Sequence, residues 1–535
     1  MTVDVIAELN AIEQLQVALP DLDWVTDSSR LARLSQDFSW FSPVLKRQLA
    51  DKRADAAVRP RTEDEIRRLV GLCAKLRVPI TVRGSGTGNY GQAVPLHGGV
   101  VLDMSGYNAH LWSRDGAGRA QVGIRLADFD KASRPAGLEL RCMPSTYRIA
   151  SLGGLFGGGF GGIGSINYGP LASPGNVLGI RAMTIEEEPQ IIELRGAEAL
   201  AMHHMWGCNG LVLEIELALA PVHDWLEVIV TFDAFDPALE FGDALARAPG
   251  IVKKEIGFFA APVPSYLTLI KDHLPDGCHA LIVLVAPTSE PALLALVAQW
   301  GGTVTYRKTA QEVAASNRTL LEYTWNHTTL NALKVDKGIT YLQCAFVAGQ
   351  HVEQVKRMEK LLGGEVLMHA EFIRNLDGLA TCTALPLVRF STEQRLQEIM
   401  QIFRDNGVRI NDPHVFIVED GKAGGELPQP IIDTKRRFDP LGLLNPGKVR
   451  AWAHSPRRPA REHQRQHHHQ HQHRAADGPL RRRAAGWRLC FSERCCRGGP
   501  GPQSRCAELR RTAAAGPRSA ARHRLRYRPD ERRSV

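Results

Sequence analysis

The sequence has few cysteines and no long hydrophobic run for its 535 residues. Apolar stretches such as 280–286 are about seven residues long, whereas a membrane-spanning helix needs about 20. The N-terminus has acidic residues where a secretory signal needs cations, so we expect a cytoplasmic protein without a membrane span. Ten cysteines are too few for a disulfide framework. The six before residue 450 are too widely spaced for a zinc or iron–sulfur motif and are expected to be buried thiols: Cys73, Cys142, Cys208, Cys278, Cys344 and Cys382.

Lysine is absent from the last 85 residues, although the whole chain carries a net charge of +9. Residues 451–535 contain 21 arginines and 6 acidic residues, so the first 450 residues carry a net charge of −6. The basic composition therefore does not predict a specific nucleic-acid partner for the main body. The Arg- and His-rich segment 451–535 has little hydrophobic periodicity, which predicts a disordered basic tail. Polyanion binding, metal binding by the His run and an out-of-frame extension are alternative interpretations of this tail.

A Walker A motif is also missing, but residues 83–91 (RGSGTGNYG) contain a glycine-rich loop after an expected strand. Gly86, Gly88 and Gly91 match the spacing of a dinucleotide fingerprint. That fingerprint needs a helix next, and here a proline- and glycine-containing segment leads into another strand, which excludes a Rossmann loop. A loop of this kind can instead bind an anion through successive backbone N–H groups, or it can be a simple turn.

The order of the expected elements predicts an α+β protein. An amphipathic helix is expected in the first 20 residues, and Thr62 with Glu65 predicts a capping box for the helix that follows. The eight glycines of 151–164 argue against any regular element there. The expected strands are 56–59, 79–83, 99–104, 177–185, 190–194, 211–219, 226–232, 280–285 and 338–347, and the later helices are 197–206, 291–300, 352–362 and 392–406.

The sequence resembles the FAD-binding domain of the vanillyl-alcohol oxidase and p-cresol methylhydroxylase (PCMH) family of flavoproteins. The motifs that carry this resemblance, in the family's order, are VRPRTEDEIRRLV, PITVRGSGTG, PSTYRIASLGGLFGGG, INYGPLASPGNVLGIRAMT, WGCNGLVLEIELAL and DPLGLLNPGKV. The family includes the FAD subunits of glycolate oxidase and D-lactate dehydrogenases. The resemblance implies two FAD-binding subdomains under a cap domain of antiparallel sheet and helices. The implied regions are an N-terminal helical segment (1–49), the FAD-binding domain (50–222), the cap or substrate domain (223–410), a C-terminal return to the FAD domain (411–450) and the tail (451–535).

The same resemblance implies a set of FAD-binding residues. Members with covalent FAD carry His where this chain has Thr87, so FAD is expected to be non-covalent. Leu211–Leu213 and the EEEP segment at 186–189 depart from the family pattern. The expected cofactor contacts are Arg83, Gly84, Ser85, Gly86, Thr87, Gly88, Pro144, Ser145, Thr146, Gly153, Gly154, Gly157, Gly158, Tyr168, Gly169, Asn176 and Ile215.

A flavin that oxidises an alcohol needs a base for the hydroxyl proton, and a carboxylate substrate needs a cation such as Arg. The family's HxGDGN segment is absent, so no metal is expected. His203 and His204 are interpreted as packing residues. The candidate catalytic residues are His327, His414, His369, Tyr323, Arg374 and Arg389.

These features predict an FAD-dependent oxidoreductase that takes hydride from a small hydroxy acid or alcohol onto flavin N5. The electron acceptor could be oxygen, a quinone or a redox protein. The protein could form a homodimer or be a subunit of a complex. Two other functions remain as alternatives: an electron-relaying or non-catalytic FAD-binding subunit, and an enzyme resembling UDP-N-acetylmuramate reductase.

Overall fold

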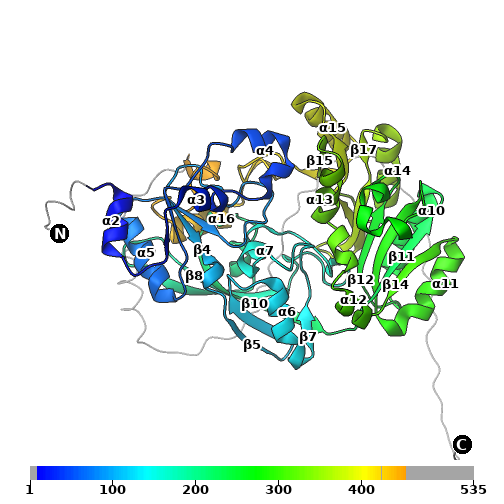
Figure 1. Ribbon diagram of the computed structural model, residues 1–535, viewed down its shortest axis with the longest axis horizontal. Coiled ribbons are helices and arrows are strands. Elements are labelled where there is room, and N and C mark those ends of the chain that lie inside the picture. The colour runs from blue at the N-terminus through cyan, green and yellow to red at the C-terminus, as the bar shows by residue number, and fades with distance from the viewer. Residues whose placement is uncertain (1–8, 423, 454–535) are drawn as a thin grey trace, which may run out of the picture. The chain divides into compact units, whose positions relative to one another are not determined.

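The computed structural model describes residues 9–422 and 424–453 of the chain (Figure 1). The predicted tail, apart from residues 451–453, lies outside the described residues. Within the described part, no helix has the length and apolar character needed to cross a membrane. The N-terminal helices are α2 (Ala11–Ala18), α3 (Ser28–Leu34) and α4 (Pro43–Gln48).

A small sheet of four strands forms the first layer. Its order is β1-β2-β4-β3, with β2, β4 and β3 parallel and β1 antiparallel to β2. Helix α5 (Glu63–Leu76) connects β2 to β3, as its capping signal predicts. Thr62 Oγ1 accepts a hydrogen bond from the Glu65 N–H, but the Glu65 carboxylate accepts from the Arg61 N–H, so only half of the capping box forms. The strands are β1 (Trp24–Val25), β2 (Ala56–Val58), β3 (Ile80–Arg83) and β4 (Val100–Asp103).

An antiparallel sheet built around the long strand β10 forms the second layer. Strand β10 pairs with β6, β7 and β8, and the sheet order is β5-β6-β10-β8-β9. The strands are β5 (His110–Arg114), β6 (Ala117–Gln121), β7 (Leu138–Leu140), β8 (Val177–Met183), β9 (Ile191–Arg195) and β10 (Leu211–Pro221), and α6 (Leu126–Ser133) lies between β6 and β7.

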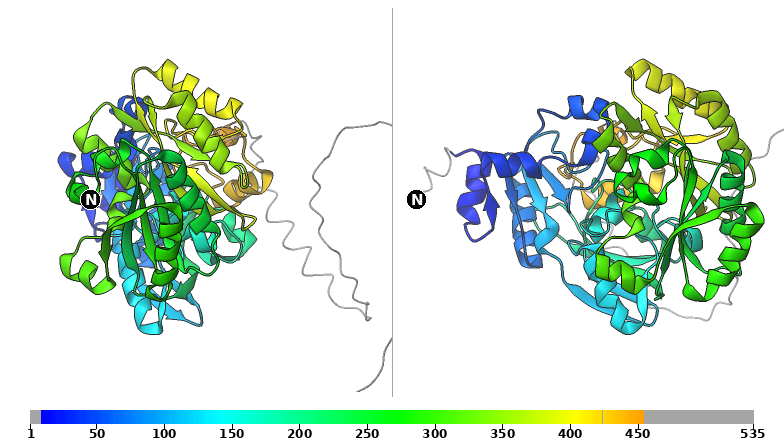
Figure 2. Two further views of the ribbon diagram at one scale, coloured as in Figure 1. Left: turned by 90° about the vertical axis from the view of Figure 1, so that its right-hand side faces the viewer. Right: turned by 45° about the vertical axis from the view of Figure 1, so that its right-hand side comes forward.

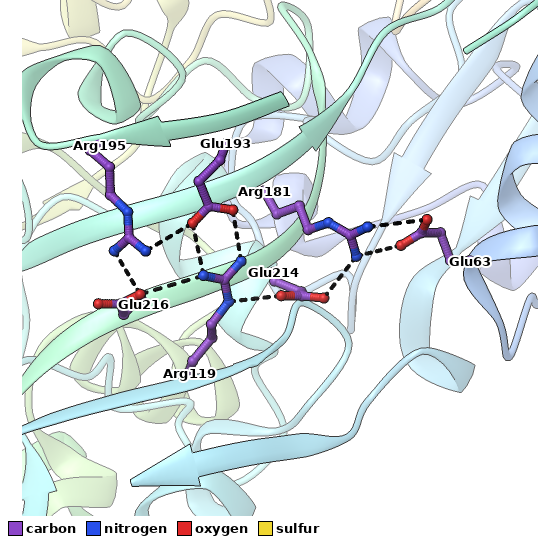
Figure 3. Close-up of polar contacts among 7 residues, drawn as sticks. All are labelled: Glu63, Arg119, Arg181, Glu193, Arg195, Glu214 and Glu216. Carbon is purple, nitrogen blue, oxygen red and sulfur yellow. Dashed lines mark hydrogen bonds and ion pairs between the residues drawn. The ribbon is translucent and has the colours of Figure 1, made fainter. Parts of the chain in front are cut away.

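A network of seven charged side chains crosses this second sheet (Figure 3). Arg119 on β6 reaches Glu193, Glu214 and Glu216, with N–O distances of 2.8, 2.7 and 3.4 Å. Arg181 on β8 binds both Glu214 and Glu63, and Glu63 belongs to helix α5. Arg195 completes the network by pairing with Glu193 and Glu216. The network therefore ties four strands of the second sheet to the helix of the first.

An eight-stranded antiparallel sheet carries most of residues 226–411. Its side chains alternate between two faces. Val228 and Val230 pack with the helices α10, α11, α14 and α15, whereas Ile229 on the opposite face joins the core of the first two sheets. Figures 1 and 2 show these helices along one side of the sheet. The helices are α10 (Phe235–Arg247), α11 (Glu290–Trp300), α14 (His351–Leu362) and α15 (Glu393–Asp405). The strand order is β14 (Thr303–Lys308), β11 (Leu226–Phe232), β13 (His279–Val285), β12 (Lys253–Phe259), β18 (His369–Arg374), β19 (Ala380–Ala384), β16 (Gln343–Ala345) and β21 (Arg409–Asn411).

The expected single strand 338–347 is wrong, because the chain changes sheets within it. The N–H of Leu342 donates to the carbonyl of Pro386, and the two halves, β15 and β16, lie in different sheets. Strand β15 (Ile339–Tyr341) joins β20 (Leu387–Arg389) and β17 (Val366–Leu367) in a three-stranded sheet. The remaining helices of this region are α12 (Ala310–Ser316) and α13 (Asn326–Val335).

The glycine-rich segment 151–164 also differs from its prediction, since it contains helix α7 (Leu152–Gly158). Ser151 caps the helix by accepting a hydrogen bond from the Gly154 N–H, at 3.1 Å. Leu152, Leu155 and Phe156 are buried on one face, which offsets the low helix propensity of glycine. A Cβ on Gly153 would lie 2.8 Å from Cβ of Val122, so glycine lets this helix pack closely on the chain after β6.

The expected helix 197–206 ends early, after α9 (Ala197–Leu200). Beyond it, His204 and Trp206 both have positive φ angles of 54°, which no helix interior allows. The short helix α8 (Ser165–Tyr168) precedes β8, and the last helices of the described residues are α16 (Gln429–Phe438) and α17 (Arg450–Ala453). Just before α17, the chain returns to the first sheet, where the Asn445 N–H donates to the carbonyl of Ile80.

Candidate FAD and substrate cavity

A cavity of about 600 Å³ lies where the first two sheets meet the eight-stranded sheet. It falls within the volume range of small-molecule and cofactor sites. The segments that line it are the loop after β3, residues 144–146, helix α7, residues 202–212, the start of α13, parts of β16, β19 and β21, and residues 418–422.

The glycine loop after β3 forms one wall of this cavity. Gly84, Ser85, Gly86, Thr87 and Gly88 all line it. Within the described residues, the backbone N–H groups of residues 85–89 donate to no other group of the protein. Successive free N–H groups of this kind form a concave site for an anion such as a phosphate.

Glycine is required in this loop because neighbouring side chains approach its backbone closely. A Cβ on Gly84 would lie 2.0 Å from Ser151 Oγ, and one on Gly88 would lie 2.1 Å from Gln92 Oε1. Gly86 has a φ of +69°, where any other residue is strained. Glycine at these positions therefore lets the loop pack closely against Ser151 and Gln92.

The second glycine segment adjoins the first, since a Cβ on Gly84 would lie 3.7 Å from the backbone N of Gly154. Its lining residues are Pro144, Ser145, Thr146, Gly153, Gly154, Gly157 and Gly158. The N–H groups of Ser145 and Thr146 also lack partners within the described part of the chain. Two uncovered backbone segments with free donors suit the diphosphate of a dinucleotide, and the apolar remainder of the cavity suits its ring systems.

Five of the expected cofactor residues do not line the cavity but support its walls. Arg83 turns away and donates to the carbonyl of Gln36. The Arg141 guanidinium lies 4.8 Å from the centre of the Tyr168 ring. Asn176 donates from Nδ2 to the carbonyls of Tyr168 and Pro170. Ile215 is fully buried in β10, and Gly169 has a φ of +69°.

Among the expected catalytic residues, only His327 lines the cavity. It lies in the first turn of α13, and its buried Nδ1 has no hydrogen-bond partner within the described residues. Burial lowers the pKa of His327 to about 4, so the imidazole is neutral at pH 7. Asn326 lines the cavity beside it, and its buried Oδ1 also lacks a partner.

The other candidate histidines are engaged elsewhere. His369 is fully buried, with Nε2 2.8 Å from Glu371 Oε1 and Nδ1 3.3 Å from the carbonyl of Leu385. His414 Nδ1 lies 2.8 Å from Ser42 Oγ, and its Nε2 lies 3.0 Å from the carbonyl of Tyr341.

Tyr323, Arg374 and Arg389 also lie outside the cavity wall. Tyr323 is buried in the turn before α13, where its carbonyl accepts a hydrogen bond from Thr328 Oγ1. Arg374 donates to the carbonyl of Gly378, and Arg389 donates to that of Gly364.

A pair of buried carboxyl groups holds the residue before Asn326. Trp325 has a φ of +52°, and its backbone N–H donates to Glu371 Oε1 at 2.6 Å. Its ring Nε1 donates to Glu255 Oε1 at 3.1 Å. Burial and their mutual repulsion raise the pKa of Glu255, and burial raises the pKa of Glu371 to about 7. The pair therefore retains a proton near neutral pH and fixes Trp325 in a conformation that most residues avoid.

Several cavity residues carry no sequence signal that would single them out. Gln343 on β16 and Arg409 and Asn411 on β21 line the cavity from the edge of the eight-stranded sheet. Lys422, His203 and His204 line another part. The sequence predicts packing roles for the two histidines, but both line the cavity, in a segment where His204 and Trp206 have positive φ angles.

Comparison with known proteins agrees with this geometry. Residues 54–190 match the family described as FAD binding domain. The chain is 25% identical to the glycolate oxidase subunit GlcD of Bacillus subtilis (strain 168) over 441 residues, which is 74% of this chain and 88% of that protein. It is 30% identical to the D-2-hydroxyglutarate dehydrogenase of Escherichia coli (strain K12) over 151 residues, 26% of this chain and 14% of that protein. The solved structure of an alkyldihydroxyacetonephosphate synthase has the same fold, with a TM-score of 0.62, 15% identity and coverage of 82% and 84%.

The fold, the glycine loops and these matches define the chain as a flavoprotein of the oxidoreductase class. Residues 54–190 form an FAD-binding domain of the PCMH type, as the sequence motifs predict. The residues that line the cavity fit FAD, because they offer free backbone donors for a diphosphate beside apolar walls.

Proposed function

We propose that this flavoprotein oxidises the CH–OH group of a small 2-hydroxy acid or alcohol. The observation that carries the proposal is the neutral His327 imidazole, which lines the cavity. The names of the similar proteins, a glycolate oxidase subunit and a 2-hydroxyglutarate dehydrogenase, support a hydroxy acid. Bound FAD would supply the acceptor for the substrate hydride.

His327 acts in this proposal as the base that takes the hydroxyl proton. Asn326 lines the cavity beside it, and its amide can form a hydrogen bond that orients the substrate. Arg409 lines the cavity, and its guanidinium has no acidic partner within 4 Å in the described part of the chain, so it can bind a substrate carboxylate. Arg409 therefore takes the role expected of Arg374 or Arg389.

The proposal includes FAD held without a covalent bond, because Thr87 offers no nucleophilic ring nitrogen at the loop. The Bacillus protein is named as a subunit, which supports assembly with a partner that carries electrons onward. The six described cysteines are all free and buried, which supports work in a reducing compartment such as the cytoplasm.

The test is anaerobic mixing of the purified yellow protein with a panel of 2-hydroxy acids, aldoses and phenolic alcohols. We expect one of the 2-hydroxy acids to bleach the flavin absorbance. Bleaching by NADPH alone would support the alternative of a reductase, and bleaching by no small substrate would support an electron-relaying subunit.

The role of His327 is tested by His327→Gln, which should slow flavin reduction by roughly 100-fold or more while FAD content stays the same. His223→Gln is the matched control, because the His223 ring packs at a tilt against Trp225 and does not line the cavity. Equal rates in His327→Gln and the control would refute His327 as the base.

A further inference from the structure

The glycine loops that suit a diphosphate contain no cation of their own. Arg83 belongs to the first loop, but its guanidinium donates to the carbonyl of Gln36 and lies near the Asp37 and Asp103 charges. The only lysine or arginine side chains that line the cavity, among the described residues, are Arg409 and Lys422. The negative charge of a bound diphosphate therefore has two candidate partners.

Lys422 lies on the same side of the cavity as the glycine loops. Its Nζ is 3.8 Å from Met205 Sδ, in the segment that follows α9. That segment is bound to the end of α7, because the N–H groups of His204 and Trp206 donate to the carbonyls of Phe156 and Gly157.

The first glycine loop also reaches this segment. Tyr90 directly follows the loop, and its ring stacks on that of Trp206 with centroids 5.0 Å apart. Lys422 thus belongs to the wall that holds both glycine segments. Arg409 belongs instead to β21, beside β16 in the eight-stranded sheet.

Lys422 has no counter-charge that would neutralise it in place. No carboxylate oxygen of the described residues lies within 4 Å of its Nζ. Burial lowers the pKa of Lys422, and the charge of Glu419 partly opposes this shift. A partly buried cation without an acidic partner is unfavourable unless an anion binds there.

A second polar group beside Lys422 also lacks a partner. His203 is 8% exposed and lines the cavity, and its Nε2 has no hydrogen-bond partner within the described part of the chain. Burial is the main reason that the pKa of His203 falls to about 4, and the nearby Lys422 charge lowers it further. A neutral imidazole can donate one N–H to a phosphate oxygen without adding charge.

We propose that Lys422, assisted by His203, is the charged partner of the FAD diphosphate and closes it against the free N–H groups of residues 85–89. This inference rests on FAD binding in the cavity and is independent of the substrate. Lys422 would bind the phosphate oxygens as a point charge, while the loop supplies directed hydrogen bonds.

The test compares ligands that differ in their phosphates. Lys422→Met removes the charge and keeps the length of the side chain, and we expect it to weaken FAD and ADP binding roughly 10- to 100-fold. Riboflavin has no phosphate, so its affinity should stay the same. Affinities are measured by flavin fluorescence and by ADP competition, on protein stripped of FAD that recovers its flavin spectrum when FAD returns.

Salt and a conservative variant give independent readouts. Added salt screens the ion pair between Lys422 and the FAD diphosphate, which only the wild type has. High salt should therefore speed FAD release from the wild-type holoprotein more than from Lys422→Met. Lys422→Arg should restore FAD affinity to within a few fold. Lys75→Met is the control, since Lys75 is exposed on α5 and far from the cavity lining.

Either of two results would overturn the proposal. Unchanged FAD affinity in Lys422→Met would show that the diphosphate does not meet Lys422. Equal weakening of FAD and riboflavin would show that Lys422 acts on the fold or on the flavin ring. Thermal unfolding of the variants stripped of FAD shows whether they are folded. If Lys422→Met does not fold, Lys422→Arg is compared with the wild type instead.

The panel of hydroxy acids and alcohols tests only the proposed reaction. If none of these compounds reduces the flavin, the test of Lys422 still stands.

Discussion

Trp325 shows how a single residue can depend on groups that do not line the cavity. Its positive φ places it among the strained residues of the chain, and two buried carboxyl groups hold its backbone and ring N–H groups. Asn326 and His327 follow directly and line the cavity. Glu255 and Glu371 are therefore expected to be positioning residues for His327.

Replacing Glu371 with Leu should slow flavin reduction by roughly 10- to 100-fold while FAD content is retained. The reason is that the Trp325 N–H loses its acceptor, so the turn that aims His327 can relax. Glu255→Gln is the conservative control, because an amide can still accept from Trp325 Nε1 and donate to Glu371. The measurement is the rate of anaerobic flavin reduction as a function of pH.

Glu255→Gln should also alter the pH dependence of stability. Burial raises the pKa of both carboxyl groups, to about 7 for Glu371, so below pH 7 the folded pair binds more protons than unfolded glutamates do. Wild-type stability should therefore fall as pH rises toward 7. Glu255→Gln removes one of the two titrating groups, so the stability of the variant should fall less steeply with pH, and an unchanged slope would contradict a raised pKa at Glu255.

At the residue scale, sequence reasoning identified residues that line the cavity where a local motif marks them. The loop 84–88 and the glycines of α7 were expected to meet FAD because their backbone must stay uncovered, and they line the cavity. His327 was a candidate from its polar, aromatic surroundings. Arg409 and Lys422 could not be predicted, because they reach the cavity only through the pairing of β21 and the return of residues 418–422.

Individual elements depend on contacts that a local pattern does not contain. The strand 338–347 has a uniform β pattern, yet Leu342 bonds to Pro386 and divides it between two sheets. Helix α7 forms despite its glycines because Ser151 caps it and three apolar residues bury one face. By contrast, α5, α14 and α15 were predicted closely, since each has a strong amphipathic period.

The charged network on the second sheet leads to a prediction about stability. Arg119 is 13% exposed and binds three carboxylates, so Arg119→Met would leave Glu193, Glu214 and Glu216 close together without their shared cation. We expect a loss of about 2–4 kcal/mol in the free energy of unfolding at pH 7. Arg195→Met should cost less than about 1 kcal/mol, because Arg195 is 54% exposed. Urea unfolding of both variants measures the difference.

The stability difference between the wild type and Arg119→Met should become smaller as pH falls. The hydrogen bond from Arg119 holds the pKa of Glu193 below its ordinary value, so that stabilisation is present at neutral pH and is lost as pH falls. The gap between wild type and Arg119→Met should therefore narrow in acid. A gap that is constant down to the lowest pH at which the protein folds would show that Arg119 stabilises by packing.

At the scale of the whole molecule, the C-terminal return holds the cofactor loop in place. Lys448 is fully buried, and its Nζ donates to the carbonyls of Gly91, Gln92 and Val94, just beyond the glycine loop. Asn445 Nδ2 donates to the carbonyls of Gln92 and Trp206. Segments 350 residues apart thus share one wall of the cavity, a pairing that only the tertiary fold reveals.

The position of this return predicts where the chain can be shortened. Deleting residues 455–535 removes all 21 arginines of the tail segment and leaves a body with a net charge of −6. Every residue that lines the cavity lies between Asp37 and Lys422, and Lys448 is retained, so FAD content should stay at the wild-type level. Deleting 441–535 removes Asn445 and Lys448 and should abolish FAD retention, because the glycine loop loses its buried supports. The flavin-to-protein absorbance ratio of the two purified truncations measures this, and loss of flavin from the shorter deletion would show that residues 455–535 contribute to FAD binding.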